Sequence, residues 1–353
     1  MAESYPVLAN CKHRVRQITA MGLLFTLVLP TGCAKKAFDD IPTTIAPAQA
    51  APSPPLTRAP AGSVRLLAGL PRYALFDGQT RLLAVVSPGA DSTAPASLTV
   101  MDAQQTSPRM IGLPGPVTGL AGDSAGTAYL STRGGYFLVD LSAGRVTTMS
   151  VRDAGQLEFS AISRRSDGTV ALGTADGQLY LLAPGSTDPR RIQVHAHVDS
   201  LAAQGNTVAV LDRGQTSITT VGADGRIAQS LRAGRGATTM FADSAGRLLV
   251  SDTRGDQLLV YGVDPLILRQ AYPIADSPYG VTGSRGLAWV SQTSANSVSG
   301  YDLSTGIPLE KVRYPSVRQP NALAFDDATG TLYVVSGAGD GVQTIEHAAA
   351  GPR

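Results

Sequence analysis

Apolar and polar positions repeat along the chain, from residue 63 onward, with a period of about 40 residues. Each unit contains a short apolar strand, a tight turn rich in Gly, Asp and Ser, a second apolar strand, a polar loop and a third strand. A fourth, more polar run closes the unit. Gly, Asp and Ser suit the turns because short hairpins need positive φ angles or local side-chain hydrogen bonds. The pattern predicts four antiparallel strands in every unit.

The number and phase of these units predict how the chain closes on itself. Four-stranded units at this spacing are typical of the blades of a β-propeller. The seventh unit ends after its third strand, near Glu346, and the segment 63–67 resembles a fourth strand without its first three. We therefore predict an all-β, seven-bladed β-propeller over residues 63–348, closed by this N-terminal strand and followed by a tail at 349–353. Six or eight blades are the alternatives. The seven units begin near residues 71, 117, 157, 198, 236, 277 and 319.

Residues 1–32 have the features of an export signal. Three basic residues precede an uncharged stretch over residues 18–32, which is too short to span a bilayer, since about 20 residues are needed. The stretch ends in the letters LPTGC, with Cys33 last. This resembles a bacterial lipobox, whose Cys receives diacylglycerol, although Pro30 departs from the usual pattern. An ordinary signal peptide cut nearby is the alternative.

The lipobox resemblance implies a lipoprotein signal peptide at 1–32, a lipid on Cys33 and a location on the extracytoplasmic side of the cell membrane. The lipid would then join the protein to the membrane. Cys11 would leave with the leader, so the mature chain would have no disulfide. The rest of the segment 33–62 is rich in Pro and Ala and lacks apolar periodicity, which predicts an extended, partly polyproline tether.

Composition narrows the classes of partner. The chain has 29 basic and 27 acidic residues, and removal of the leader takes away three basic residues and one acidic residue, which leaves equal numbers. Such a balance argues against duplex DNA, whose binding depends on phosphate neutralisation. An aromatic share of 5% leaves few platforms for stacking bases or sugars. We expect no nucleic-acid partner, and instead an envelope protein or a small polar ligand.

Two apolar segments carry a resemblance to a broad propeller group. Residues 278–281 (PYGV) and 320–325 (PNALAF) resemble repeats of the NHL, YncE-like and SMP-30 propellers. Together with the lipobox and the Pro-rich segment, the whole chain resembles an actinobacterial lipoprotein, most closely of the mycobacterial LppL type. The resemblance implies a location and a fold rather than an activity. We therefore expect a binding or scaffold module and not an enzyme, with no cofactor.

Charged loop residues are the first candidate site. In a propeller, the loops between the second and third strands share one face with the connections from the fourth strand to the next blade, and ligands commonly bind there. Charges of both signs in these loops indicate a polar ligand or a protein surface, or else hydrogen bonds within the loops themselves. The residues are Arg133, Asp176, Asp212, Arg213, Asp252, Arg254, Asp256 and Asp340.

A divalent metal is the second candidate. In an extended chain, His195, His197 and Asp199 would point the same way, and two imidazoles with a carboxylate suit zinc or another transition metal. The resemblance to SMP-30-like lactonases implies another set, in which Asn321 matches a cation-binding asparagine and Glu158 and Asp199 occupy comparable first-strand positions. The alternative function is accordingly a metal-dependent lactonase or hydrolase that acts in the central channel.

Three further features have plainer interpretations. Residues 122–126 (GDSAG) match the serine-hydrolase elbow around Ser124, but a strand follows where that elbow needs a helix. We therefore expect a hairpin turn. The RGD tripeptide at 254–256 is expected to be a tight loop. Trp289, in the second strand of the sixth unit, is predicted to pack between blades.

Overall fold

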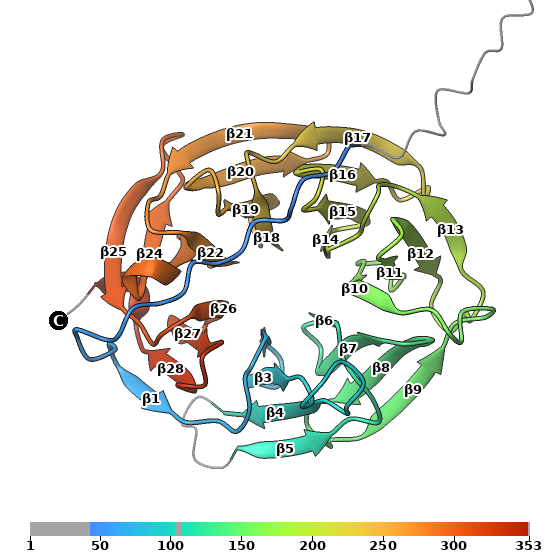
Figure 1. Ribbon diagram of the computed structural model, residues 1–353, viewed down its shortest axis with the longest axis horizontal. Helices are drawn as coiled ribbons and strands as arrows, with labels where there is room; N and C mark the ends of the chain where they lie inside the picture. The colour runs from blue at the N-terminus through green and yellow to red at the C-terminus, as the bar shows by residue number, and fades with distance from the viewer. Residues whose placement is uncertain (1–42, 103–107, 352–353) are drawn as a thin grey trace, which may run out of the picture. The chain divides into compact units, whose positions relative to one another are not determined.

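Seven four-stranded antiparallel sheets form a closed ring around a central opening in the computed structural model (Figure 1). The structure describes residues 43–102 and 108–351, so the leader and Cys33 lie outside the described residues. Within those ranges, no helix is long and apolar enough to cross a membrane. The fold is the predicted all-β propeller, and seven is the number of its blades.

Each blade is one sheet, and we number the blades 1 to 7 in chain order. Blade 1 consists of β2 (Tyr73–Asp77), β3 (Leu82–Ser87), β4 (Ser97–Met101) and β5 (Arg109–Gly112). Blade 2 consists of β6 (Gly119–Gly122), β7 (Thr127–Thr132), β8 (Gly135–Asp140) and β9 (Val146–Ser150). Blade 3 consists of β10 (Phe159–Arg164), β11 (Val170–Thr174), β12 (Gln178–Leu182) and β13 (Arg190–Gln193). Blades 4 and 5 consist of β14 (Ser200–Gln204), β15 (Thr207–Asp212), β16 (Ser217–Val221) and β17 (Ile227–Arg232); and β18 (Ala237–Ala242), β19 (Arg247–Asp252), β20 (Gln257–Val263) and β21 (Leu266–Pro273). Blades 6 and 7 consist of β22 (Pro278–Gly283), β23 (Ala288–Gln292), β24 (Ser297–Asp302) and β25 (Leu309–Pro315); and β26 (Pro320–Asp326), β27 (Thr331–Ser336), β28 (Val342–Ile345) and β1 (Ser63–Arg65).

The ring closes between the two ends of the chain. Strand β1 pairs antiparallel with β28, with Ser63 opposite Thr344 and Arg65 opposite Val342. The predicted closure by an N-terminal strand is confirmed, although the strand ends at Arg65. This pairing covers the edge of β28, which would otherwise be open to pairing with another chain.

The core lies between neighbouring blades. Second and third strands are buried along nearly their whole length because both of their faces are covered, whereas a fourth strand such as β17 is mostly exposed. Trp289 of β23 is fully buried and stacks on Phe325 of blade 7, with 5.7 Å between the ring centroids. The predicted packing of Trp289 between blades is therefore confirmed.

The N-terminal part of the described chain differs from a free tether. Residues 44–56, which we call the strap, are extended and run across the loops of blades 4 to 7 (blue in Figure 1) before the chain enters β1. An extended, Pro-rich chain has no internal hydrogen bonds, so its backbone groups are free to pair with these loops. After β28 the chain forms the short 3-10 helix η2 (Ala348–Ala350), in which Ala348 is buried and the next two residues are exposed.

Candidate binding face

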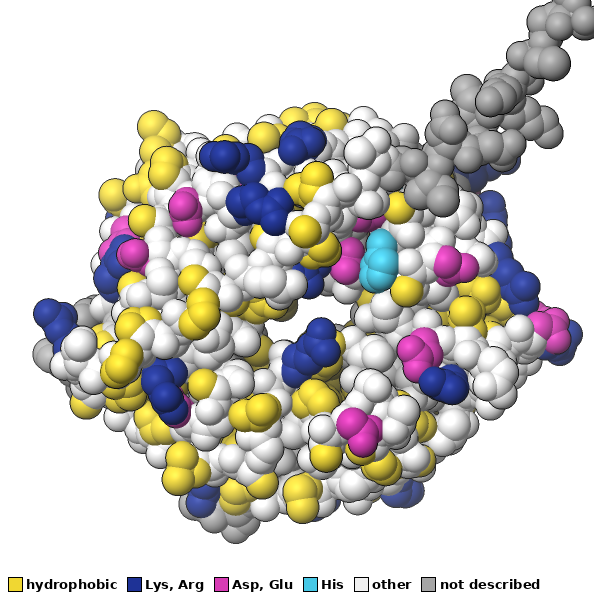
Figure 2. All heavy atoms as spheres, in the orientation of Figure 1, with side chains coloured by type: hydrophobic (Ala, Val, Ile, Leu, Met, Phe, Trp, Pro, Cys, Tyr) yellow, Lys and Arg dark blue, Asp and Glu magenta, His cyan; other side chains and the backbone are white. Residues whose placement is uncertain are grey.

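We call the face that carries the strap the upper face; it is turned toward the reader in Figures 1 and 2. Its loops join second to third strands and fourth strands to the next blade, so every residue of the predicted charged set lies on it. Figure 2 shows charged side chains of both signs around a central opening on this face. The hydrogen-bond and ion-pair partners of each charged residue show whether it has a structural role or is available for binding.

Two of the predicted aspartates are buried structural acceptors. Asp252 is fully buried, and its carboxylate accepts hydrogen bonds from the backbone N–H groups of Arg235 (2.9 Å), Gly236 (2.7 Å) and Gly255 (3.0 Å). Asp212, at the same place in blade 4, accepts from the backbone N–H groups of His197 (2.9 Å) and Gln215 (2.8 Å). Each aspartate ties its own loop to the connection from the preceding blade. These carboxylates are therefore not free to meet a ligand.

Two of the predicted arginines hold the strap. Arg254 donates from Nη2 to the carbonyl oxygen of Ala46 at 2.7 Å, and Arg213 donates from Nη2 to the carbonyl oxygen of Ala48. Both guanidinium groups thus bind a polypeptide backbone, which happens to belong to the same chain.

The remaining charged residues form local pairs or stay exposed. Arg133 makes an ion pair of 2.6 Å with Glu158 of the next blade, and Asp340 makes one of 2.6 Å with Arg318. Asp176 accepts hydrogen bonds from Thr174 and Gln178 within its own loop. Asp256 is exposed. This part of the upper face carries the charge that a partner can reach.

The two histidines of the candidate metal set point to different partners. His195 Nδ1 lies 2.9 Å from Gln215 Oε1, whereas His197 Nδ1 lies 3.3 Å from Asp199 Oδ1. Residues 194–199 form a bent loop rather than a strand, so the alternation expected of an extended chain does not apply. Among the residues that the structure describes, no group of three or more His, Cys, Asp or Glu side chains lies close enough to hold a metal ion.

The lactonase-like set is also divided among separate partners. Glu158 is paired with Arg133 in the adjoining blade, and Asp199 accepts a hydrogen bond of 2.7 Å from the backbone N–H of Arg213. Asn321 lies at the start of the innermost strand of blade 7, directly beneath Gly337. Its Oδ1 is buried, and no polar atom of the described residues hydrogen-bonds to it. One unsatisfied carbonyl oxygen does not by itself make a cation site.

The different surroundings of His195 and His197 shift their pKa values in opposite directions. The Asp199 carboxylate raises the pKa of His197 above its ordinary 6.5, whereas burial lowers the pKa of His195 despite its hydrogen bond to Gln215. The stabilising contribution of the His197–Asp199 pair is therefore complete below pH 6.5 and is lost as the pH rises through the folded-state pKa of His197. Protonation of His195, by contrast, opposes folding as the pH falls.

NMR titration of the imidazole resonances checks this prediction. We expect His197 to titrate above 6.5 and His195 below it, and Asp199→Asn to lower the pKa of His197 while His195 changes little. An unchanged His197 titration in Asp199→Asn would contradict the pairing.

Sequence reasoning missed three residues whose side chains bind the strap. Gln319, Ser277 and Asn296 contact it from the connections before and within blades 6 and 7. Each adopts a left-handed backbone conformation, with φ angles of 47°, 58° and 47°. Left-handed conformations of non-glycine residues are uncommon and cluster at functional sites. No local sequence signal distinguishes these positions, because a polar residue in a loop is expected in any case.

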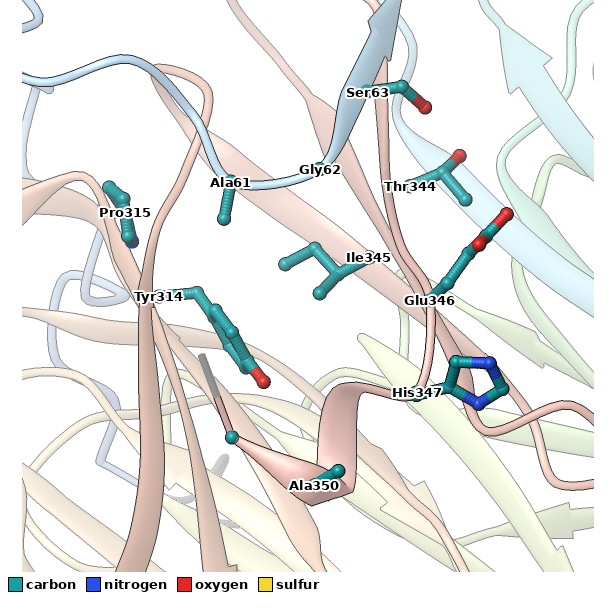
Figure 3. A pocket seen from close by; sticks show the side chains of 11 residues that line it. Ala61, Gly62, Ser63, Tyr314, Pro315, Thr344, Ile345, Glu346, His347 and Ala350 are labelled. Carbon is teal, nitrogen blue, oxygen red and sulfur yellow. The ribbon is translucent and has the colours of Figure 1, made fainter. Parts of the chain in front are cut away.

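A pocket of about 680 Å³ lies away from these contacts, beside the closure of the ring. Ile345 points toward Tyr314 and Ala61, whereas Glu346 and His347 point away to the other side (Figure 3). The Tyr314 hydroxyl donates a hydrogen bond of 2.7 Å to the carbonyl oxygen of Ala348. The groups that point inward are thus mainly apolar, and the tyrosine hydroxyl is already used.

No family model matches the chain, and no curated protein matches it. The resemblance to actinobacterial lipoproteins therefore stays a prediction. Solved structures are similar in fold. Hydrazine synthase from Kuenenia stuttgartiensis is 12% identical with a TM-score of 0.63, over 81% of this chain and 98% of that chain. Streptogramin B lyase is 12% identical with a TM-score of 0.66, over 80% of this chain and 96% of that chain.

A chain of the mitotic checkpoint complex is 13% identical with a TM-score of 0.64, over 93% of this chain and 98% of that chain. Chains from two enzymes and from one multiprotein complex thus share this fold. At such low sequence identities the likeness concerns the fold alone. The chain is a β-propeller.

Proposed function

We propose that this protein is an exported lipoprotein, anchored by a lipid on Cys33, whose propeller binds an envelope partner through its upper face. One observation carries the binding part of the proposal: loop side chains of that face hydrogen-bond a polypeptide segment, the strap, along blades 4 to 7. Loops on a rigid propeller ring are well suited to recognition because they vary without disturbing the sheets.

The strap also supports a particular arrangement at the membrane. The first strap residue hydrogen-bonded to the ring is Ile45, whose N–H donates to the carbonyl oxygen of Gly214 at 2.8 Å. Only the chain between Cys33 and Ile45 is then left as a spacer, and an extended chain of that length reaches about 40 Å. The upper face would accordingly stay near the membrane, where neighbouring envelope proteins are found.

Membrane anchoring is tested by comparing two cysteine substitutions in a host that processes lipoproteins. We expect Cys33→Ala to move the protein from the membrane fraction and the detergent phase into the soluble fraction, because the lipid acceptor is lost. The matched control, Cys11→Ala, leaves the protein in the membrane, since Cys11 belongs to the leader. Equal membrane association of both variants would refute the lipid anchor.

The competing proposal, a metal-dependent hydrolase, predicts a different response to metal removal. A ligand that binds only the native state at 100 times its dissociation constant adds about 2.7 kcal/mol to stability, which raises the unfolding midpoint of a body this size by several degrees. We expect EDTA, Ca²⁺, Mg²⁺, Mn²⁺ and Zn²⁺ to leave the midpoint unchanged. A saturable shift that Asn321→Ala or His197→Ala abolishes would favour the hydrolase.

A further inference from the structure

We infer that the upper face of blades 4 to 7 has a binding surface, which we call the groove, for an extended, uncharged, Ala- and Pro-rich polypeptide, and that a partner's segment of this chemistry binds there when the strap is displaced. The inference deepens the proposed use of the upper face and rests on it, but it does not depend on the lipid anchor. The strap shows what the groove recognises.

Recognition is directed at the main chain of the bound segment. In the described residues, Ser53 is the only strap residue whose side chain hydrogen-bonds to the ring. All other hydrogen bonds between strap and ring use backbone N–H or carbonyl groups of the strap. An extended backbone without internal hydrogen bonds presents such groups regularly. The contacts are Ile45 N to Gly214 O (2.8 Å), Arg254 Nη2 to Ala46 O (2.7 Å), Arg213 Nη2 to Ala48 O, Ala51 N to Ser277 Oγ (3.0 Å), Gln319 Nε2 to Ala51 O (3.2 Å), Ser53 N to Gln319 Oε1 (3.1 Å), Ser53 Oγ to Thr293 O (2.7 Å), Gln319 N to Ser53 Oγ (2.6 Å) and Asn296 Nδ2 to Pro54 O (2.8 Å).

One position of the groove demands a small side chain. Ala48 is the buried residue in the middle of the strap, with only 4% of its surface exposed. A Cβ added to Gly236 would lie 2.9 Å from the Cβ of Ala48, which is closer than two such atoms approach in practice. A large or charged residue at position 48 of the strap therefore cannot fit, whereas its neighbour Gln49 is exposed.

The shape of the groove is set by the ring and not by the strap. Ser277, Asn296 and Gln319 hold left-handed backbone conformations within loops of blades 5 to 7, and such conformations persist where the surrounding structure determines them. The strap itself belongs to no sheet. It can leave without breaking a blade, because the closure of blade 7 begins only at Ser63.

The strap is also held more weakly than a strand would be. Most of its residues are exposed, and segments with few buried contacts open locally at low cost in free energy. As a covalently attached occupant, the strap competes with any partner at an effective concentration of about millimolar. A free peptide is therefore expected to bind poorly to the wild-type protein and well once the strap has been expelled.

The test measures binding of a fluorescein-labelled peptide with the sequence of residues 43–56 to the purified mature protein by fluorescence anisotropy. Ala48→Glu in the protein expels the strap and leaves the groove intact. The matched control, Gln49→Glu, adds the same charge at an exposed position. We expect the Ala48→Glu protein to bind the peptide at least tenfold more tightly than the wild type or the Gln49→Glu protein.

Two further arms make the result specific to the groove. A peptide that itself carries Glu at position 48 should bind at least tenfold more weakly, and adding Gln319→Ala to the Ala48→Glu protein should weaken binding of the unchanged peptide. If Ala48→Glu fails to fold, as judged by circular dichroism, Ser53→Pro replaces it, because it removes the N–H and the hydroxyl that bind Gln319.

The inference is overturned if a folded, strap-released protein does not bind the peptide, or binds both peptides equally. Cys33→Ala should leave peptide binding unchanged. A protein that binds the peptide but does not partition into membranes would therefore refute the anchor alone, and one that partitions but does not bind would refute the groove alone.

Discussion

Replacing Trp289 with alanine is expected to lower the free energy of unfolding by about 3–5 kcal/mol, the range for truncation of a buried tryptophan. The indole is fully buried, stacks on Phe325 and donates a hydrogen bond from Nε1 to Ser284 Oγ at 3.3 Å. The substitution would leave a cavity in the hydrophobic cluster between blades 6 and 7. Blade 7 is the blade that β1 completes. Trp289 is the only tryptophan, so the variant has no tryptophan fluorescence with which to follow unfolding. Urea denaturation monitored by far-UV circular dichroism measures the loss of stability instead.

Ser284→Ala tests the hydroxyl that accepts the hydrogen bond of the indole. The same hydroxyl also accepts from the backbone N–H of Leu287 and donates to the carbonyl oxygen of Leu287, both at 3.0 Å. Its removal therefore leaves buried polar groups unsatisfied, without a large cavity, and should cost about 1–3 kcal/mol. A loss below about 1 kcal/mol in Trp289→Ala itself would mean that the side chain behaves as a surface residue, and would contradict its place between the blades.

Asp252→Ala is expected to destabilise the protein by about 3 kcal/mol or more. The substitution leaves three backbone N–H groups, those of Arg235, Gly236 and Gly255, without their acceptor, and each unsatisfied buried donor costs about 1–3 kcal/mol. Gly234 and Gly255 pack directly against the carboxylate, so little room exists for water to replace it. Thermal and urea unfolding report the loss.

The comparison with Asp212 separates a structural role from ligand binding. Asp212→Ala removes the acceptor of only two backbone N–H groups and should cost less than Asp252→Ala. Asp252→Asn should fall between the wild type and Asp252→Ala, because one carbonyl oxygen remains to accept hydrogen bonds. A wild-type unfolding curve for Asp252→Ala would return this aspartate to the set of candidate ligand residues.

The predicted fold was largely right because its signals are local. Turn residues such as those in the GDSAG segment recur at each hairpin, and in the structure Ser124 takes a positive φ of 56° within that turn. Strand alternation and turn chemistry act over a few residues and repeat in every blade, so the count of repeats predicted seven blades, and the seven sheets of the structure exclude the alternatives of six and eight. The missing fourth strand of the last unit predicted the pairing of β1 with β28 for the same reason.

The candidate site was predicted less well, because a loop residue's partner is set by distant segments. The sequence placed Arg213 and Arg254 on the loop face but could not indicate that they bind Ala48 and Ala46, which lie 165 and 208 residues away along the chain. Likewise, nothing local distinguishes the buried Asp252 from the exposed Asp256. A charged side chain is expected to be exposed. Asp252 is buried instead because its own loop and the connection from blade 4 pack around its carboxylate.

By itself, then, the sequence determined the all-β class and the closure of the propeller, and it favoured seven blades over six or eight, because these features follow from periodic burial and from turn residues that act over short distances. The tertiary structure alone decided that the segment before β1 lies across blades 4 to 7. That contact joins backbone groups of a proline-rich chain to side chains from four blades, and backbone groups leave no pattern in a sequence. The same holds for Gln319, Asn296 and Ser277, whose roles come from where their loops meet the strap.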